Sequence, residues 1–228
     1  AIIVLSGLTA RASALTVKAL ERGAFDFITK PAADSIEQSK ELVLEALRPR
    51  VNALSRRREI QALLRQPGAP KPVAPRPPAV APRPQPATRA AEPAARQWVS
   101  RKPDMVLIGV STGGPNALAQ LLPGIPRDIG VPILIVQHMP PIFTASLADS
   151  LSTKCGIRVR EARAGEALEP NTAYIAPGGR QMRIVNGGGS GVVQVTDDPP
   201  ENNCRPAVDY LFRSAATHFP GRSMSVVL

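Results

Sequence analysis

The chain has 228 residues, of which 43% are hydrophobic, enough for one large domain or two small ones. Its formal net charge of +10 at pH 7 is not evenly spread, because residues 48–103 alone hold thirteen basic and two acidic residues, a net +11. This charge belongs to a connecting segment and does not predict a specific nucleic-acid-binding face, although weak contact with RNA or an acidic membrane stays an alternative.

Membrane and secretory classes are also disfavoured. No apolar run is long enough for a transmembrane segment, and the N-terminus does not resemble a signal peptide. Cys155 and Cys204 lack the spacing of metal ligands, so we expect reduced thiols, no metal site and a cytoplasmic location.

Residues 1–47 predict alternating strands and helices, with strands at 2–5 and 25–28 and helices at 12–22 and 36–47. Ser6 and Lys30 follow the two strands directly. Parallel pairing would bring both to one sheet edge, where a phosphoryl group can bind. The alternative is an ordinary βαβα unit with polar loop residues.

Residues 48–103 are predicted to join two units. The helix is expected to continue through Arg56–Arg58, and a proline- and arginine-rich stretch from Pro67 to Pro103 predicts a semi-extended linker.

The second unit, residues 104–228, begins with an apolar run, Met105–Val110, that predicts a buried strand ending at Ser111. Gly109-Val-Ser111-Thr-Gly113 matches the G-x-S-x-G elbow, which exposes a serine hydroxyl at the top of a sheet, and Pro115 suits the start of a helix. Ser111 is therefore a candidate nucleophile. The alternative is a glycine-rich turn that binds phosphate, or nothing.

A second apolar run, residues 132–137, ends at His138. Continuous apolar strands separated by a helix predict parallel neighbours, so Ser111 and His138 should meet at one sheet edge. A serine nucleophile needs a base, and imidazole is the usual one. His218 lies near a predicted helix end, where a capping or solvated histidine is expected.

The acid that would orient His138 is not evident. Asp149, Asp197 and Asp198 do not follow buried strands, and Asp209 lies at a predicted helix start, where it suits the helix dipole. Residues 223–228 predict another buried strand, and we expect the acid in a loop after it, in a chain truncated at both ends. Residues 174–195 predict a surface hairpin with a glycine-rich tip.

Residues 1–47 resemble the last part of a two-component receiver domain. In that family the residues at the positions of Ser6 and Lys30 contact the acyl phosphate, and the lysine is usually joined to its proline by a cis bond. The phosphorylated aspartate and the Mg²⁺ ligands lie on earlier strands, so the resemblance implies that they are absent here. The motifs are Leu5-Ser6-Gly-Leu-Thr9, Ala19-Leu-Glu-Arg-Gly-Ala-Phe-Asp-Phe27 and Lys30-Pro31.

The whole chain resembles CheB-type chemotaxis protein-glutamate methylesterases. The resemblance implies that Ser111 is the nucleophile, His138 the base and Thr112 a supporting residue, and that the family's aspartate lies beyond Leu228. Gln181 stands where the family often has histidine. The motifs are Ile108-Gly-Val-Ser-Thr-Gly-Gly-Pro115, Val136-Gln-His-Met-Pro140, Ala173-Tyr-Ile-Ala-Pro-Gly-Gly-Arg180 and Arg205-Pro-Ala-Val-Asp209.

We therefore expect an α/β protein with three parts: the C-terminal part of a flavodoxin-like receiver domain (1–47), a helix extension and linker (48–103), and a doubly wound, mostly parallel methylesterase domain (104–228). The resemblance implies hydrolysis of glutamyl methyl esters, with deamidation of glutamines, on methyl-accepting chemoreceptors. A chemotaxis histidine kinase would supply phosphate with Mg²⁺, and the esterase chemistry itself would need no cofactor. Without the acid, turnover should fall about 10⁴-fold, so the chain alone should be nearly inactive. The alternative is a non-enzymatic adaptor that binds a partner through the serine-bearing domain.

Overall fold

The computed structural model describes residues 1–65, 102–188 and 190–228, so the predicted linker lies mostly outside the described residues. The N-terminal segment consists of β1 (Ile3–Ser6), α1 (Ala10–Glu21), β2 (Asp26–Thr29) and α2 (Ile36–Arg65). β1 and β2 pair in parallel, as expected. α2 continues well past residue 47, which confirms that the helix extends toward the linker.

The second unit is built on a five-stranded sheet with the order β5-β6-β4-β3-β9, in which every pairing is parallel. This arrangement confirms the α/β class and the predicted pairing of the strands that precede Ser111 and His138. The strands are β3 (Met105–Val110), β4 (Ile133–Gln137), β5 (Arg158–Glu161), β6 (Thr172–Ile175) and β9 (Met224–Val227).

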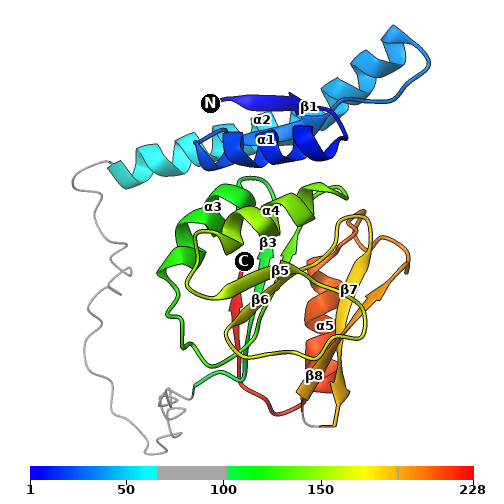
Figure 1. The fold of residues 1–228 in the computed structure, drawn as a ribbon. Helices are drawn as coiled ribbons and strands as arrows, with labels where there is room; N and C mark the ends of the chain where they lie inside the picture. Colours follow the sequence, from blue (N-terminus) through cyan, green and yellow to red (C-terminus); the bar gives the residue numbers. More distant parts are fainter. Residues whose placement is uncertain (66–101, 189) are drawn as a thin grey trace, which may run out of the picture.

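Both faces of the sheet are covered, which explains why its central strands are apolar throughout. One face packs against α3 (Gly114–Leu121) and α4 (Phe143–Ser152), with the short 3-10 helix η1 (Leu122–Gly124) after α3. The other packs against α5 (Val208–His218) and a separate antiparallel hairpin, β7 (Gln181–Gly187) and β8 (Ser190–Thr196). Figure 1 shows the hairpin and α5 on the opposite side of the sheet from α3 and α4.

Two sequence predictions need correction. β9 is not a buried strand: Val226 is 51% exposed, because among the described residues β9 has a neighbour, β3, on one side only. The predicted hairpin begins at Gln181, whereas Tyr174 belongs to β6 in the central sheet. The hairpin is also more than a surface feature, since Met182 and Ile184 are fully buried against the core.

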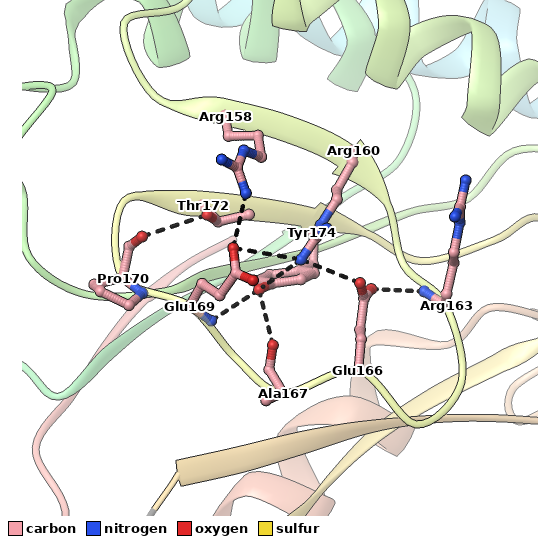
Figure 2. A network of polar contacts seen from close by, with 9 residues as sticks. All are labelled: Arg158, Arg160, Arg163, Glu166, Ala167, Glu169, Pro170, Thr172 and Tyr174. Atoms are coloured by element: carbon pink, nitrogen blue, oxygen red, sulfur yellow. Dashed lines mark hydrogen bonds and ion pairs between the residues drawn. The ribbon is translucent and has the colours of Figure 1, made fainter.

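Strand β5 and the loop after it are fixed by a polar network around Tyr174, which Figure 2 shows. The buried Tyr174 hydroxyl donates to Ala167 O (3.2 Å) and accepts from Glu169 N–H (2.8 Å) and from Arg160 (3.3 Å). Arg160 also lies over the tyrosine ring and pairs with Glu166 at 3.2 Å. The network anchors the 162–171 loop over the second face of the sheet.

The N-terminal segment packs on the α3–α4 side of the second unit, above the carboxyl ends of β3 and β4 (Figure 1). Phe27 stacks on Phe143, with ring centroids 4.5 Å apart. The Ser13 and Ser146 hydroxyls lie 2.7 Å apart. Lys154 Nζ is 2.6 Å from a carboxylate oxygen of Glu21. Apolar stacking and polar contacts therefore join α1 and β2 to α4.

Candidate active site

Ser111 and His138 follow β3 and β4, and these strands are adjacent with Val110 opposite Gln137. The residues that come next therefore emerge side by side at the same sheet edge. Ser111 Oγ lies 3.2 Å from Nδ1 of His138. The structure thus brings together the two side chains that the sequence singled out, at hydrogen-bonding distance.

Gln137 holds the main chain at both Ser111 and His138, a role that its place at the end of an apolar strand did not reveal. Its buried side-chain amide donates to Ser111 O (3.0 Å) and His138 O (3.2 Å). Gly114 makes room for that amide, because a Cβ there would lie 1.9 Å from Gln137 Oε1. Gly113, the residue just before α3, has φ +78°, a left-handed conformation that favours glycine.

His138 is half-buried, and its two ring nitrogens have different surroundings. Cys204 Sγ lies 3.7 Å from Nδ1, on the same nitrogen that faces Ser111. Nε2 is buried and makes no hydrogen bond within the described parts of the chain. Burial lowers the pKa of His138, and the negative charge of Asp209 opposes this effect. The imidazole is therefore held in its neutral form near pH 7, as a general base requires.

Asp209 lies in the first turn of α5, as predicted, but it also faces the site. With Ser111 and His138 it lines a cavity of about 670 Å³, and its carboxylate accepts a hydrogen bond from Asn202 Nδ2 at 2.7 Å. The sequence could not indicate this placement, because α5 is far along the chain from β3 and β4. Arg57 of α2 lines the same cavity from the N-terminal segment.

Thr112, the predicted supporting residue, is exposed and also lines this cavity. Its side chain lies near enough to the buried carboxylate of Asp26 in β2 to influence the pKa of that group. Burial raises the pKa of Asp26, while the Phe27 amide, Arg50 and Thr112 act against that shift. The N-terminal segment thus lies beside Thr112 and lines the same cavity as the candidate nucleophile.

Ser6 and Lys30 are brought together by their main chains, since Lys30 N–H donates to Ser6 O at 2.7 Å. Their side chains differ in environment. The Ser6 hydroxyl is buried and accepts from Thr16 Oγ1 at 2.6 Å, whereas Lys30 is exposed. Within the described residues the cis peptide bond is Arg205–Pro206 and not the expected Lys30–Pro31 bond.

His218 and Gln181 lie outside the cavity that contains Ser111. His218 is the last residue of α5, as predicted. Gln181 begins β7 and is fully buried. Its amide oxygen accepts from Ala207 N–H (2.8 Å), and its amide nitrogen donates to Pro199 O (3.1 Å) and Cys204 O (3.3 Å).

Among the described residues, no three or more histidine, cysteine, aspartate or glutamate side chains gather closely enough to hold a metal ion. None of the described helices has the length and apolarity needed to cross a membrane.

The family model of the CheB methylesterase matches residues 106–228. The chain belongs to the CheB methylesterase family. The matched region contains all five strands of the parallel sheet except the first residue of β3, together with Ser111 and His138.

Similar proteins carry names from the same family. A protein-glutamate methylesterase/protein-glutamine glutaminase of Desulfotalea psychrophila is 48% identical over 99% of this chain and 60% of its own length. One from Trichodesmium erythraeum is 40% identical over 100% of this chain and 60% of its own length. The crystal structure of the Thermotoga maritima CheB methylesterase catalytic domain has a TM-score of 0.53 and 38% identity, covering 55% of this chain and 66% of that one. The chain thus spans about 60% of the length of these two curated relatives.

Proposed function

We propose that this chain carries the hydrolytic site of a protein-glutamate methylesterase that cleaves glutamyl methyl esters on chemoreceptors and also deamidates glutamine side chains. The observation that carries the proposal is the 3.2 Å approach of Ser111 Oγ to His138 Nδ1 at one sheet edge. The names of the relatives, which include both activities, support the choice of substrate.

The reaction would follow the usual course of serine hydrolases. His138 takes the Ser111 proton as Oγ attacks the ester carbonyl, and a tetrahedral oxyanion forms. Backbone amides at the start of α3 and the Thr112 hydroxyl would stabilise that oxyanion. The imidazolium gives its proton to the leaving methoxide, so methanol departs and an acyl-serine remains. Water, deprotonated by His138, then releases the glutamate and restores Ser111. Every proton in this cycle is carried by His138.

The orienting acid is part of the same proposal. Nε2 of His138 makes no hydrogen bond within the described residues, and a triad acid would accept one there. We assign that role to an aspartate outside the described residues. Neither a metal nor an organic cofactor takes part in a step of this reaction.

Control by a receiver domain would act through the N-terminal segment. Its stacking on Phe143 and its share in lining the Ser111 cavity support this route, and Ser6 and Lys30 would sense a phosphoryl group. The phosphodonor would be a chemotaxis histidine kinase. The described residues provide no cluster of ligands for the Mg²⁺ of that step. The free thiols of Cys155 and Cys204 suit a cytoplasmic protein.

The decisive test is Ser111→Ala in the longest natural protein that contains this sequence. The variant is incubated with membranes whose chemoreceptors carry labelled methyl esters. Its rate of methanol release should be at least about a thousandfold lower than that of the unmodified protein. It should still bind the receptors in a sedimentation assay, because only one hydroxyl is removed. Ser152→Ala, at the end of α4, serves as a serine control. Unchanged methanol release would overturn the esterase proposal and favour the adaptor, in which the serine-bearing domain only binds a partner.

A further inference from the structure

The loop between β8 and α5, residues 197–207, is held more tightly than its polar composition suggests. Glu201 and Cys204 exchange backbone hydrogen bonds of 2.9 and 3.0 Å. Asn202 and Asn203 both adopt positive φ, at 51° and 61°. Gly179 N–H donates to Arg205 O at 3.1 Å, which joins the loop to the turn after β6. Several independent constraints therefore give this loop a single conformation.

Gln181 is the buried centre of these constraints. Its side chain is 0% exposed, and its one amide group makes three hydrogen bonds, all to main-chain atoms of the loop or its junction with α5. The acceptor Oε1 holds Ala207 N–H, and Nε2 holds the carbonyls of Pro199 and Cys204. Breaking these bonds would leave unpaired groups in a dry environment, so the loop is expected to stay where Gln181 places it.

The loop places the Cys204 thiol 3.7 Å from His138 Nδ1. Burial and the charge of Asp209 raise the pKa of Cys204, so the group stays a neutral thiol beside the imidazole. A thiol against one nitrogen limits how far the ring can rotate away from Ser111. The position of this thiol follows from the main chain of Cys204, and that main chain is bonded to Gln181.

We propose that Gln181 is a positioning residue for the esterase site: it fixes the 197–207 loop, and through Cys204 the loop holds the His138 ring toward Ser111. This role rests on the proposed esterase function. It also assigns a purpose to a residue that lies outside the catalytic cavity and touches neither Ser111 nor His138.

The test uses Gln181→Met, which keeps the length and volume of the side chain but removes all three hydrogen bonds. Gln181→His, which can donate one bond and accept one, should be intermediate. Variants are made in the longest natural protein containing this sequence. Local release of the loop is measured by the rate of alkylation of Cys204 with iodoacetamide, resolved by peptide mass spectrometry, with Cys155 as the internal reference.

We expect alkylation of Cys204 to accelerate about tenfold in Gln181→Met, with Cys155 unchanged. The kcat for methanol release should fall roughly ten- to hundredfold with KM within about twofold, because a misplaced base slows chemistry more than binding. The matched control is Ser214→Ala, which removes a buried hydroxyl joining β7 to α5 (2.7 and 3.0 Å) away from the loop. It should lower stability without changing Cys204 reactivity.

Two results would overturn the positioning role. One is a folded Gln181→Met protein with unchanged Cys204 reactivity and kcat. The other is equal acceleration at Cys204 and Cys155, which would mean general destabilisation only. If Gln181→Met does not fold, Gln181→His decides by the same two readouts. Absence of methanol release in the unmodified protein would refute the proposed function instead, and the alkylation rates would still judge the loop.

Discussion

The geometry of the Ser111–His138 pair depends on residues that support its main chain as well as on the two side chains themselves. Gln137 holds the carbonyl groups of Ser111 and His138 with one side-chain amide, and Gly114 leaves the space that this amide fills. At the scale of single residues, an atom added at Gly114 should therefore disturb the packing of the site, and a change of charge near His138 should shift the pKa of its imidazole.

Gly114→Ala tests the packing around Gln137. The new Cβ would lie 1.9 Å from Gln137 Oε1, so the amide must move and release both carbonyls. We expect a loss of about 1–3 kcal/mol in the free energy of unfolding, measured by urea titration, together with a fall in methanol release. Gly124→Ala is the control, since nothing lies within 4 Å of its added Cβ. Equal stability of the two variants would contradict the close packing inferred here.

Asp209→Asn tests the effect of nearby charge on the pKa of His138. The carboxylate raises the pKa of His138 against the lowering effect of burial, so its removal should lower that pKa further. Because the neutral imidazole is the base, the acid limb of the kcat/KM profile should move to lower pH. Asp149→Asn, an exposed acid on α4 outside the cavity, should leave the limb in place. A limb that stays fixed in Asp209→Asn, or moves to higher pH, would refute the electrostatic coupling.

At the scale of elements, the polar network around the buried Tyr174 holds a loop against the second face of the sheet. β5 lies at a sheet edge, and the loop that follows it crosses the second face of the sheet. The hydroxyl of Tyr174, in β6, is hydrogen-bonded to that loop at Ala167 and Glu169, so β6 and the loop are joined (Figure 2).

Tyr174→Phe should therefore destabilise the protein although it removes only one oxygen atom. The Glu169 N–H and Ala167 carbonyl lose a buried partner, and we expect a loss of about 1–3 kcal/mol in urea unfolding. The chain's other tyrosine provides the control. The Tyr210 hydroxyl is hydrogen-bonded to Thr196 and Asp198, but Tyr210 is partly exposed and Asp198 is exposed, so water can take over these bonds and Tyr210→Phe should cost less. A larger loss for Tyr210→Phe would show that the network does not anchor the loop.

At the scale of the whole molecule, the N-terminal segment lies beside the edge of the sheet where Ser111 is exposed, and it forms part of the cavity lining there. The Phe27–Phe143 stack joins β2 to α4. Access to Ser111 should therefore depend on how firmly the segment is attached.

Phe27→Ala should weaken this attachment. Phe27 is 5% exposed and Phe143 is 0% exposed, so the substitution leaves a cavity and should cost about 3–5 kcal/mol of stability. We expect Ser111 to react faster with a fluorophosphonate probe, measured by intact-protein mass spectrometry. Leu15→Ala on the exposed side of α1 should change neither quantity. Slower labelling in a folded Phe27→Ala variant would argue against occlusion by the segment.

The sequence by itself determined the central strands, their parallel pairing and the meeting of Ser111 with His138. Continuous apolar runs separated by a helix leave few other arrangements, and parallel neighbours bring the residues that follow them to one edge. The pairing of Ser6 with Lys30 along the main chain follows from the same rule.

Only the tertiary structure decided which residues surround that pair. Asp209 and Cys204 approach His138 because α5 packs against the sheet, and Gln181 reaches the 197–207 loop from a hairpin that local pattern placed at the surface. The exposure of β9 likewise follows from its place at the edge of the sheet. Local periodicity reports which faces are buried, but contacts between distant segments depend on how whole layers pack, and no short stretch of sequence records that.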